Sequence, residues 1–232
     1  MTVEVPLKPM SSRDSAGSRV NRVRITEIFH SLQGESRTVG LPTVFVRLTG
    51  CPLRCVYCDT EYAFHGGEWR EIDDICREVA SYQARHVTVT GGEPLAQFNA
   101  DRLIHALADG GQEVSVETSG AMDISVLDDR IVRVMDIKTP GSGEVDRNRW
   151  ENLDQLRPTD QLKFVICNRA DYEWSRDLLR RESLQDRCEV LFSPEHQGLK
   201  PAQLAEWILE DRLPVRFQLQ LHKYLWGDVP GR

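Results

Sequence analysis

The sequence predicts a single α/β domain built on a largely parallel sheet. Short runs of β-branched and apolar residues recur along the chain, and helix-like stretches lie between several of them. Strands that alternate with helices are typical of a parallel sheet. No linker, repeat or low-complexity tract divides the 232 residues, so we expect one domain over residues 22–232.

The predicted elements alternate from residue 23 onward. The predicted strands cover residues 23–29, 43–48, 86–90, 113–117, 132–137, 162–166, 189–192 and 215–221. The predicted helices cover residues 72–82, 100–107, 172–181 and 202–210. The second helix ends at two glycines, and the fourth follows Pro201.

Residues 1–21 are predicted to form a flexible tail, because they contain prolines, hydroxyl residues and mixed charges and no apolar core of a signal peptide. The formal net charge of -7 disfavours nucleic acid, whose phosphates require many Lys and Arg contacts. No apolar run approaches the roughly 20 residues that span a bilayer. We therefore expect a cytoplasmic protein with a small-molecule substrate and with neither nucleic acid nor membrane as a partner.

Three of the six cysteines lie within eight residues, as Cys51, Cys55 and Cys58 in the segment TGCPLRCVYCDT. This spacing indicates metal or cluster ligands in a reducing compartment rather than disulfides. A closed 4Fe-4S cluster or zinc site takes four protein ligands, so three thiolates leave one position open for a substrate or cofactor. A zinc site completed by His30 or His65 is the alternative.

Other polar motifs directly follow predicted strands. Residues 86–94, HVTVTGGEP, run into two glycines whose missing side chains let backbone groups approach a ligand closely. The segments ETSG at residues 117–120 and DIK at residues 136–138 end the next two strands. The carboxyl ends of parallel strands meet at one edge, which predicts that these groups lie near the cysteines. The alternative interpretations are simple turns, a capped turn and an exposed strand-end lysine.

The cysteine segment resembles the signature of the radical S-adenosylmethionine (SAM) superfamily, with an aromatic residue before the last cysteine. The resemblance implies that the cysteines hold a 4Fe-4S cluster whose fourth iron binds SAM. It also implies that one electron cleaves SAM to a 5'-deoxyadenosyl radical, which the protein positions and shields. The SAM-binding residues that it implies are Tyr57, Gly92, Glu93, Glu117, Ser119, Asp136 and Lys138.

The segments TEIFHSLQGE, TVFVRLTGC and LHKYLWG are similar to those of the 7-carboxy-7-deazaguanine synthase family, over most of residues 22–228. That family consists of carbon-nitrogen lyases that convert 6-carboxy-5,6,7,8-tetrahydropterin to 7-carboxy-7-deazaguanine with release of ammonia, in queuosine-type 7-deazapurine biosynthesis. The radical is expected to take hydrogen from substrate C6, with SAM regenerated. The implied fold is a modified, incomplete TIM-like (β/α) barrel, and the implied assembly is a homodimer. The resemblance also implies an external flavodoxin-like or ferredoxin-like protein that reduces the cluster.

The same resemblance implies Mg2+ at Thr60 and a set of substrate-binding residues. These are Leu32, Gln33, Gly34, Glu35, Arg47, Thr90 and His222. Glu35 can accept paired N–H donors from a pterin, and Arg47 can bind a carboxylate through its planar fork. We expect the Arg47 pair to be made only with substrate, and His222 to bind rather than act as a base. The alternatives are a solvated Glu35 and an Arg47 that points to water. No acid or base is assigned.

Two features depart from the family pattern, and two other functions share part of the signature. Ser193 stands where some relatives place a pocket glutamine, and the chain continues to Arg232, past the terminal carboxylate that some relatives supply.

A glycyl-radical-enzyme activase shares the cysteine spacing and the GGEP segment, but the QGE and LHKYLWG segments argue against it. In a zinc-stabilised binding module the cysteines would hold metal only for folding.

Overall fold

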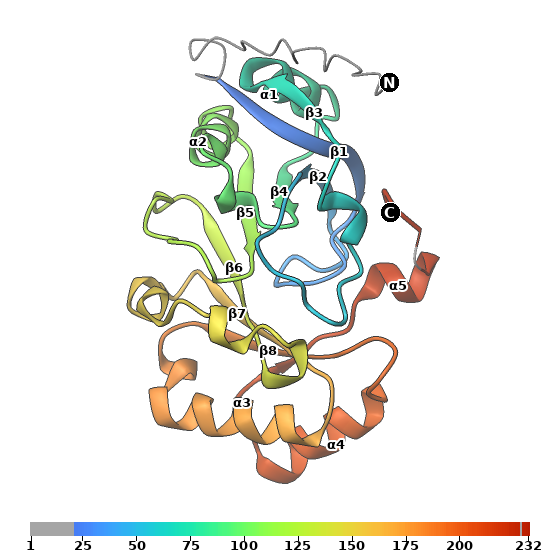
Figure 1. Ribbon diagram of the computed structural model, residues 1–232, viewed down its shortest axis with the longest axis vertical. Helices are drawn as coiled ribbons and strands as arrows, with labels where there is room; N and C mark the ends of the chain where they lie inside the picture. Colours follow the sequence, from blue (N-terminus) through green and yellow to red (C-terminus); the bar gives the residue numbers. More distant parts are fainter. Residues whose placement is uncertain (1–20, 228) are drawn as a thin grey trace, which may run out of the picture.

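The computed structural model describes residues 21–227 and 229–232, so the predicted tail lies outside the described residues except for Asn21. The α/β prediction is confirmed: helices flank a nine-stranded sheet (Figure 1). The strands are β1 (Arg22–Leu32), β2 (Pro42–Leu48), β3 (Glu68–Glu71), β4 (His86–Gly91), β5 (Glu113–Thr118), β6 (Val132–Ile137), β7 (Gln161–Ile166), β8 (Glu189–Pro194) and β9 (Arg216–Phe217). The α-helices are α1 (Ile72–Ser81), α2 (Ala100–Asp109), α3 (Arg169–Glu182), α4 (Pro201–Asp211) and α5 (Leu221–Trp226).

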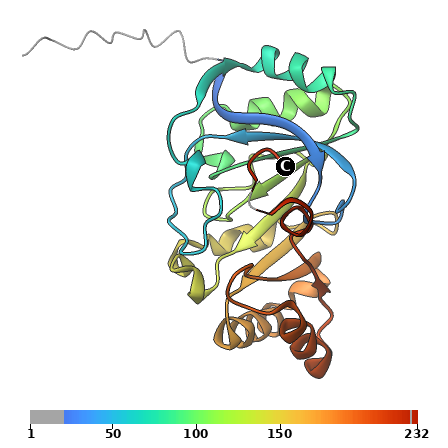
Figure 2. The same ribbon diagram turned by 90° about the vertical axis from the view of Figure 1, so that its right-hand side faces the viewer.

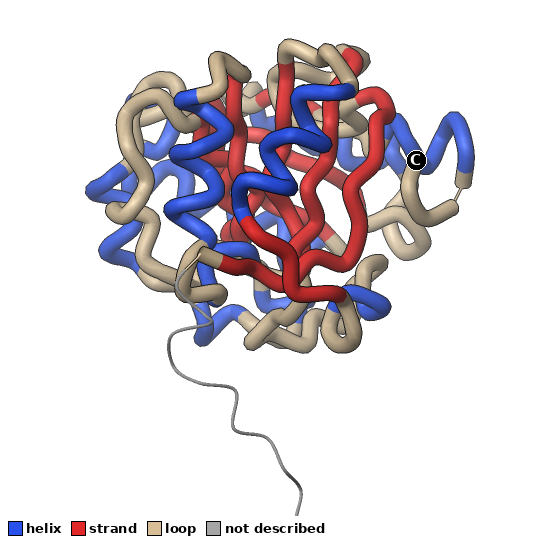
Figure 3. Tube along the Cα trace, turned by 90° about the horizontal axis from the view of Figure 1, so that it is seen from above, coloured by secondary structure: helices blue, strands red, loops and turns tan. Residues whose placement is uncertain are grey.

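The sheet is open, with the strand order β3-β1-β2-β4-β5-β6-β7-β8-β9. From β2 to β9 all neighbours are parallel, whereas β1 runs antiparallel to both β2 and β3. Because β3 and β9 have only four and two residues, both exposed edges are short, which limits edge-to-edge association. In the view of Figure 3 the strands lie at the centre of the molecule, and α5 stands apart from the other helices.

Successive side chains of each strand point to opposite faces of the sheet, and in this protein the two faces differ in chemistry. In β2, Val44, Val46 and Leu48 belong to a buried apolar cluster, whereas Phe45 and Arg47 line a cavity on the other face. The same alternation recurs in β4, β5, β6 and β7. One face of the sheet is therefore the core, and the other is available for a ligand.

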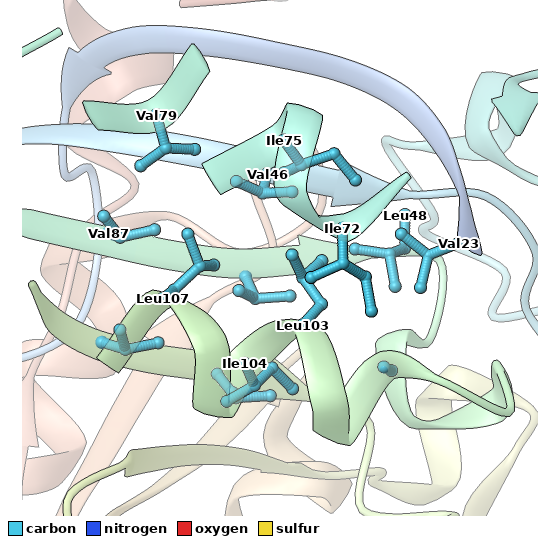
Figure 4. Close-up of a cluster of buried hydrophobic side chains, with 14 of the residues drawn as sticks. Val23, Val46, Leu48, Ile72, Ile75, Val79, Val87, Leu103, Ile104 and Leu107 are labelled. Atoms are coloured by element: carbon cyan, nitrogen blue, oxygen red, sulfur yellow. The ribbon is translucent and has the colours of Figure 1, made fainter. Parts of the chain in front are cut away.

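Helices α1 to α4 cover the apolar face. Helix α1 presents Ile72, Ile75 and Val79 to the strands, and α2 packs Leu103 and Leu107 beside them (Figure 4). These positions recur at helical spacing, so one stripe of each helix is buried. Helices α3 and α4 cover β6, β7 and β8 in a second cluster. Each fully buried aliphatic side chain contributes about 1.5–3 kcal/mol to the free energy of folding. This packing stabilises the sheet whose opposite face lines the cavity.

The prediction for the C-terminal region was wrong. Residues 215–221 were predicted as one strand, but only Arg216–Phe217 pairs with β8, and a helix begins at Leu221. The amide N–H of Gln218 still donates to Phe192 O of β8, whereas that of Leu221 donates to Gly34 O in the β1–β2 loop, so the chain leaves the sheet edge after Gln218. Figure 2 shows this C-terminal segment lying across the middle of the sheet. The short polar strand β3 was not predicted.

Within the described residues, no helix has the length and apolar character to cross a membrane.

Candidate active site

A cavity of about 240 Å3 lies at the carboxyl ends of the parallel strands. Every site residue predicted from the sequence lines it except Glu93. These lining residues are Leu32, Gln33, Gly34, Glu35, Arg47, Cys51, Cys55, Tyr57, Cys58, Thr60, Thr90, Gly92, Glu117, Ser119, Asp136, Lys138 and His222. Residues from the β1–β2 loop to the C-terminal helix therefore meet at one place, as the position of the motifs after strands predicted.

The three cysteines lie on an irregular loop between β2 and the short turn at Glu61–Ala63. A backbone hydrogen bond from Val56 N to Ser142 O at 3.0 Å connects the loop to the rest of the protein, and one from Cys58 N to Cys55 O at 3.1 Å forms a turn within it. Leu53 is buried and pins the loop between the first two cysteines. The sequence between the cysteines thus sets where the thiols face the cavity.

All three thiols share one wall of the cavity. Burial raises their pKa values, to about 11 for Cys55. No three His, Cys, Asp or Glu side chains among the described residues are close enough to hold one ion, whereas the thiolates of a 4Fe-4S cluster each bind a different iron atom. Neither His30 nor His65 lines the cavity. Three soft thiolates on a single loop fit an iron-sulfur cluster with one open position.

The wall next to the cysteines has polar atoms that lack partners. Tyr57 Oη and Asp136 Oδ1 are buried and accept or donate no hydrogen bond within the described part of the chain. Burial, followed by the charge of Asp136, raises the pKa of Tyr57, so its hydroxyl stays a neutral donor. A buried polar atom without a partner is costly unless a ligand satisfies it. These atoms therefore fit a polar ligand such as SAM beside the thiols.

Lys138 extends this wall. Its ammonium donates to Asp136 Oδ2 at 2.8 Å and lies 5.8 Å from the ring centre of Tyr57. Although burial opposes it, the charge of Asp136 raises the pKa of Lys138, so the side chain stays cationic. A fixed ammonium can attract a carboxylate as a point charge.

Glu93 has a different position from the one that the sequence suggested. Its fully buried carboxylate does not line the cavity but accepts hydrogen bonds from Thr118 Oγ1 at 2.9 Å, Ser119 N at 2.7 Å and Leu95 N at 3.0 Å. It therefore joins the ends of β4 and β5. Gly92 lets the loop after β4 lie against the cysteine loop after β2, because a Cβ at this position would lie 2.6 Å from the Cβ of Cys51.

The opposite part of the cavity centres on Glu35, which follows β1. Its Oε2 pairs with Lys163 Nζ at 2.5 Å, and its Oε1 accepts from Gln220 Nε2 at 2.8 Å. Burial acts to raise the pKa of Glu35, but the charges of Lys163 and His222 hold it below its usual value. Glu35 is therefore an ionised, oriented acceptor and not a solvated loop acid.

Glu117, which was predicted to bind SAM, is hydrogen-bonded to two of the predicted substrate residues. It accepts hydrogen bonds from Thr90 Oγ1 at 3.1 Å and Gln33 Nε2 at 3.3 Å. Burial, followed by repulsion from Glu35, raises its pKa. Two carboxyl groups in one cavity with pKa values displaced in opposite directions can act as an acceptor and a potential proton carrier.

The expectation that Arg47 makes its charged pair only with substrate was wrong. Its Nε donates to Glu27 Oε1 at 2.7 Å, and its guanidinium lies 5.8 Å from the ring centres of both Phe29 and Tyr62. Glu27 lies opposite Arg47 in the register of β1 and β2, which explains the pair. The terminal guanidinium nitrogens have no partner among the described residues, so they remain able to bind an anion.

His222 packs against Gly34. A Cβ on Gly34 would overlap the imidazole, and Leu221 N donates to Gly34 O at 2.8 Å. This contact depends on glycine because there is no space for a methyl group. The QGE segment and the C-terminal helix, far apart in the sequence, are therefore joined at the cavity wall.

Thr60 closes the cavity near the last cysteine. Its hydroxyl donates to Asp59 Oδ1 at 2.8 Å, and Asp59 Oδ2 pairs with Lys223 at 2.9 Å. Although partial burial opposes it, the hydrogen bond and charge of Lys223 lower the pKa of Asp59 to about 2. Hydroxyl and carboxylate oxygens on one loop are the donor type that Mg2+ prefers.

Several residues that line the cavity were not predicted from the sequence. The most important is Lys163 on β7, and the others include Phe29, Phe45, Asp59, Glu195, His196, Gln220, Lys223 and Arg232. Lys163 interrupts the apolar run LKFVI, and its alternation with buried Leu162 and Phe164 is the signal that could have found it. Ser193 is buried and does not line the cavity.

A family model for the radical SAM superfamily matches residues 45–136. The match begins in β2, includes the three cysteines and ends in β6 at Asp136. With a thiol-lined cavity at the carboxyl ends of a parallel sheet, these findings define a radical SAM enzyme, a class that uses a 4Fe-4S cluster and SAM.

Relatives then specify the family. A 7-carboxy-7-deazaguanine synthase of Koribacter versatilis is 43% identical, over 88% of this chain and 97% of its own length. One of Chlorobaculum tepidum is 42% identical, over 90% of this chain and 97% of its own length. The chain belongs to the 7-carboxy-7-deazaguanine synthase family, and this membership decides against the activase and the zinc module.

Solved structures agree on the fold. The crystal structure of QueE from Escherichia coli matches with a TM-score of 0.71 at 22% identity, over 87% of this chain and 95% of that one. Streptococcus suis SuiB bound to S-adenosylmethionine matches with a TM-score of 0.52 at 14% identity, over 74% of this chain and 45% of that one. The incomplete barrel expected from the sequence is confirmed.

Proposed function

We propose that the cavity contracts the ring of 6-carboxy-5,6,7,8-tetrahydropterin to 7-carboxy-7-deazaguanine with release of ammonia. The observation that carries the proposal is the meeting of two chemically different walls in one cavity. One wall has the thiols of Cys51, Cys55 and Cys58 with the unpartnered atoms of Tyr57 and Asp136. The other has ionised Glu35 and the free guanidinium edge of Arg47.

The two walls assign different tasks to the residues. The bound cluster and SAM supply the electron and the radical chemistry. Tyr57, Asp136 and Lys138 would hold the polar groups of SAM next to the thiols. Gly92 and Ser119, which also line the cavity, would bind it through backbone and hydroxyl groups. Glu93 would act from behind this wall by holding Ser119 in place.

The substrate residues match the groups of a carboxylated pterin. Glu35 accepts two N–H donors when ionised, and Arg47 donates two N–H bonds to a carboxylate. Gln33 and Thr90 orient Glu117, so this carboxyl group would face the substrate ring. Leu32, Gly34 and His222 would complete the pocket.

We propose Mg2+ as a further ligand, at Thr60. The position of Thr60 in the cavity next to Asp59 supports this assignment, because Mg2+ binds few protein oxygens and retains waters or substrate oxygens. A substrate carboxylate near Thr60 would then contact both the ion and the protein.

We propose a flavodoxin-like or ferredoxin-like protein as the electron donor and a homodimer as the assembly. Val56, between two of the cysteines, has 75% of its surface exposed, which supports access of a donor to the cluster loop. Tyr224 and Leu225 on α5 are exposed at 83% and 45%, and exposed apolar side chains of this kind support contact with a second copy.

Metal analysis tests the cluster. Protein reconstituted without oxygen should hold about four irons and four sulfides per chain, the composition of a cubane cluster. Zinc without acid-labile sulfide would contradict the assignment of the cysteines.

Turnover tests the substrate. The reconstituted enzyme, given SAM, a reductant, Mg2+ and 6-carboxytetrahydropterin, should release 7-carboxy-7-deazaguanine and ammonia in equal amounts. An enzyme that cleaves SAM but releases neither product would reject the substrate. Omission of Mg2+ should raise the substrate KM with less effect on the KM for SAM, and equal KM values with and without Mg2+ would reject the ion.

A further inference from the structure

Lys163 lies where the two walls of the cavity meet. It extends from β7, and in the sheet register it stands directly beside Asp136 of β6. Its Nζ is 2.5 Å from Glu35 Oε2 and 3.9 Å from Asp136 Oδ2, and Asp136 Oδ2 is 2.8 Å from Lys138 Nζ. Four charges of alternating sign thus run without a break from the substrate wall to the SAM-side wall.

Lys163 offsets an excess of negative charge in a buried place. Three carboxyl groups face its ammonium: Glu35 from the β1–β2 loop, Glu117 from β5 and Asp136 from β6. Only 15% of its side chain and 12% of that of Glu35 are exposed, so solvent screens these charges little. Although burial opposes it, these carboxylates raise the pKa of Lys163, which keeps it cationic.

The state of Glu35 depends on this neighbour. The groups that face Glu35 are the cationic Lys163, the imidazole of His222 on α5, the carboxyl of Glu117 and the neutral amide of Gln220. Without the Lys163 ammonium, burial and Glu117 would both favour the protonated form of Glu35. A protonated carboxyl loses acceptor capacity and no longer matches paired N–H donors.

We propose that Lys163 is a positioning residue of the reaction, which keeps Glu35 ionised and aimed at the substrate while its second carboxylate contact supports Asp136 on the SAM side. The inference rests on the proposed function, because it gives Glu35 the substrate as its ligand. Lys163 also lines the cavity, but the carboxylates of Glu35 and Asp136 engage its ammonium, and it acts through Glu35. Asp136 keeps Lys138 as a closer partner, so the effect on SAM is the smaller one.

The test compares Lys163→Met with Lys163→Arg in the reconstituted holoenzyme, and Lys200→Met, an exposed lysine outside the cavity, is the matched control. KM for 6-carboxytetrahydropterin and for SAM is measured from about pH 6 to 9. Dividing each variant's KM by the wild-type value at the same pH cancels the titration of the substrate itself.

For Lys163→Met we expect the substrate KM ratio to reach about 10–100-fold near pH 6.5, the loss of a charge-assisted hydrogen bond. The ratio should fall as the pH rises, because Glu35 ionises without help at higher pH. The KM for SAM should change less than about threefold. Lys163→Arg should restore most of the substrate affinity and a ratio that does not vary with pH, and Lys200→Met should match the wild type.

Combination with Glu35→Gln provides a second test, which also serves if Lys163→Met alone folds poorly. A neutral pair is tolerated where a single buried charge is not. If Lys163 acts through Glu35, adding Lys163→Met to Glu35→Gln should change the substrate KM by less than about threefold.

Three results would each overturn the inference: a substrate KM ratio for Lys163→Met that is independent of pH, an arginine variant as impaired as the methionine one, or additive effects in the double variant. A wild-type enzyme that does not turn over the pterin would reject the proposed function instead.

Discussion

At the scale of single residues, Arg47 shows how a binding group is prepared in advance. Glu27 and two aromatic rings fix its position, so the side chain loses little further freedom when a ligand binds. This arrangement lowers the entropic cost of forming a bidentate contact with a carboxylate.

Arg47→Ala should therefore weaken substrate binding by about 10–100-fold, the effect of losing a hydrogen bond to a charged group. The SAM affinity and the iron content should stay near wild type, because Arg47 contacts neither the cysteines nor Asp136. Arg85→Ala, which removes an exposed pair with Glu113 at the other end of the sheet, is the control. Loss of iron from Arg47→Ala alone would show that Arg47 is structural. The measurements are equilibrium binding and iron analysis.

Tyr57 offers a test with two opposite effects. Its hydroxyl is buried without a partner, so Tyr57→Phe removes a desolvation penalty and should leave the free energy of unfolding unchanged or raise it by up to about 1 kcal/mol. The same change should lower the SAM affinity by about 2–10-fold if the hydroxyl binds SAM. Chemical denaturation and SAM titration measure the two effects. Tyr82→Phe, at an exposed site outside the cavity, should change neither, and unchanged SAM affinity in Tyr57→Phe would contradict the assignment.

The site residues that were predicted from the sequence belong to recognisable segments. Cys51, Glu35 and Arg47 lie in such segments and line the cavity. Lys163 lies in an otherwise apolar strand, and its importance depends on Glu35, 128 positions away in the sequence. Such a pair follows from the tertiary fold and has no local signature. The same reason explains why the contact of Arg47 with Glu27 was not foreseen.

At the scale of secondary structure elements, the predictions were correct for the strands and helices that have a buried apolar face. The parallel strands β4 to β8 and the helices α1 to α4 have apolar faces. The bounds predicted from the periodicity of their sequences were correct to within a few residues. Strand β3 has only four residues, three of them charged, and therefore gave no pattern. Residues 215–221 alternate like a strand, but only the part that reaches β8 becomes one.

The loop before β7 depends on one buried carboxylate. Asp160 is fully buried and accepts from the backbone N–H groups of Arg133 and Arg157, both at 3.0 Å, and its carboxylate faces their guanidinium groups. Asp160→Ala should lower the free energy of unfolding by about 3–5 kcal/mol, because it leaves buried Arg133 uncompensated. Asp154→Ala, which breaks an exposed pair, should cost less than about 1 kcal/mol. Equal costs in chemical denaturation would contradict this account.

The contact between Gly34 and the C-terminal helix can be tested by steric change. Gly34→Ala should displace His222, since the new methyl group and the imidazole cannot occupy the same space, and should lower substrate affinity by about 10-fold or more with little loss of stability. His222→Ala removes the imidazole and leaves only its Cβ, at 3.1 Å from the new methyl group, a contact that a small shift relieves. In the double variant the methyl group should therefore add little to the effect of losing His222. A double variant that shows the product of both single effects in substrate titration would contradict this explanation.

At the scale of the whole molecule, the cavity depends on the chain beyond the last strand, but the core does not. The two apolar clusters extend no further than Phe217, whereas Gln220, His222 and Lys223 all line the cavity. Removal of residues 220–232 should therefore leave a cooperative thermal transition and a bound cluster. It should reduce substrate affinity by at least about 10-fold, because hydrogen bonds to charged groups are lost. Circular dichroism and substrate titration measure these effects, and an unfolded truncated chain would contradict the division.

The location of the cavity could be predicted from the sequence because the ends of parallel strands share one edge. Its closure could not, since the C-terminal helix is short and is anchored by contacts with residues far away in the sequence, among them Gln220 with Glu35, Leu221 with Gly34 and Lys223 with Asp59. A helix of this length carries no periodic signal.

The alternation of side chains along each strand has a consequence for how this protein can change over generations. Substitutions of the aliphatic residues on the face covered by helices alter folding stability. Substitutions on the face that lines the cavity alter the chemistry of the site, so stability and chemistry can vary nearly independently. An insertion or deletion of one residue inside β6 or β7 would exchange the faces, placing Asp136 or Lys163 against the helices and an aliphatic residue in the cavity. Point substitution is therefore the accessible route to new specificity, and length variation should be confined to the loops between elements.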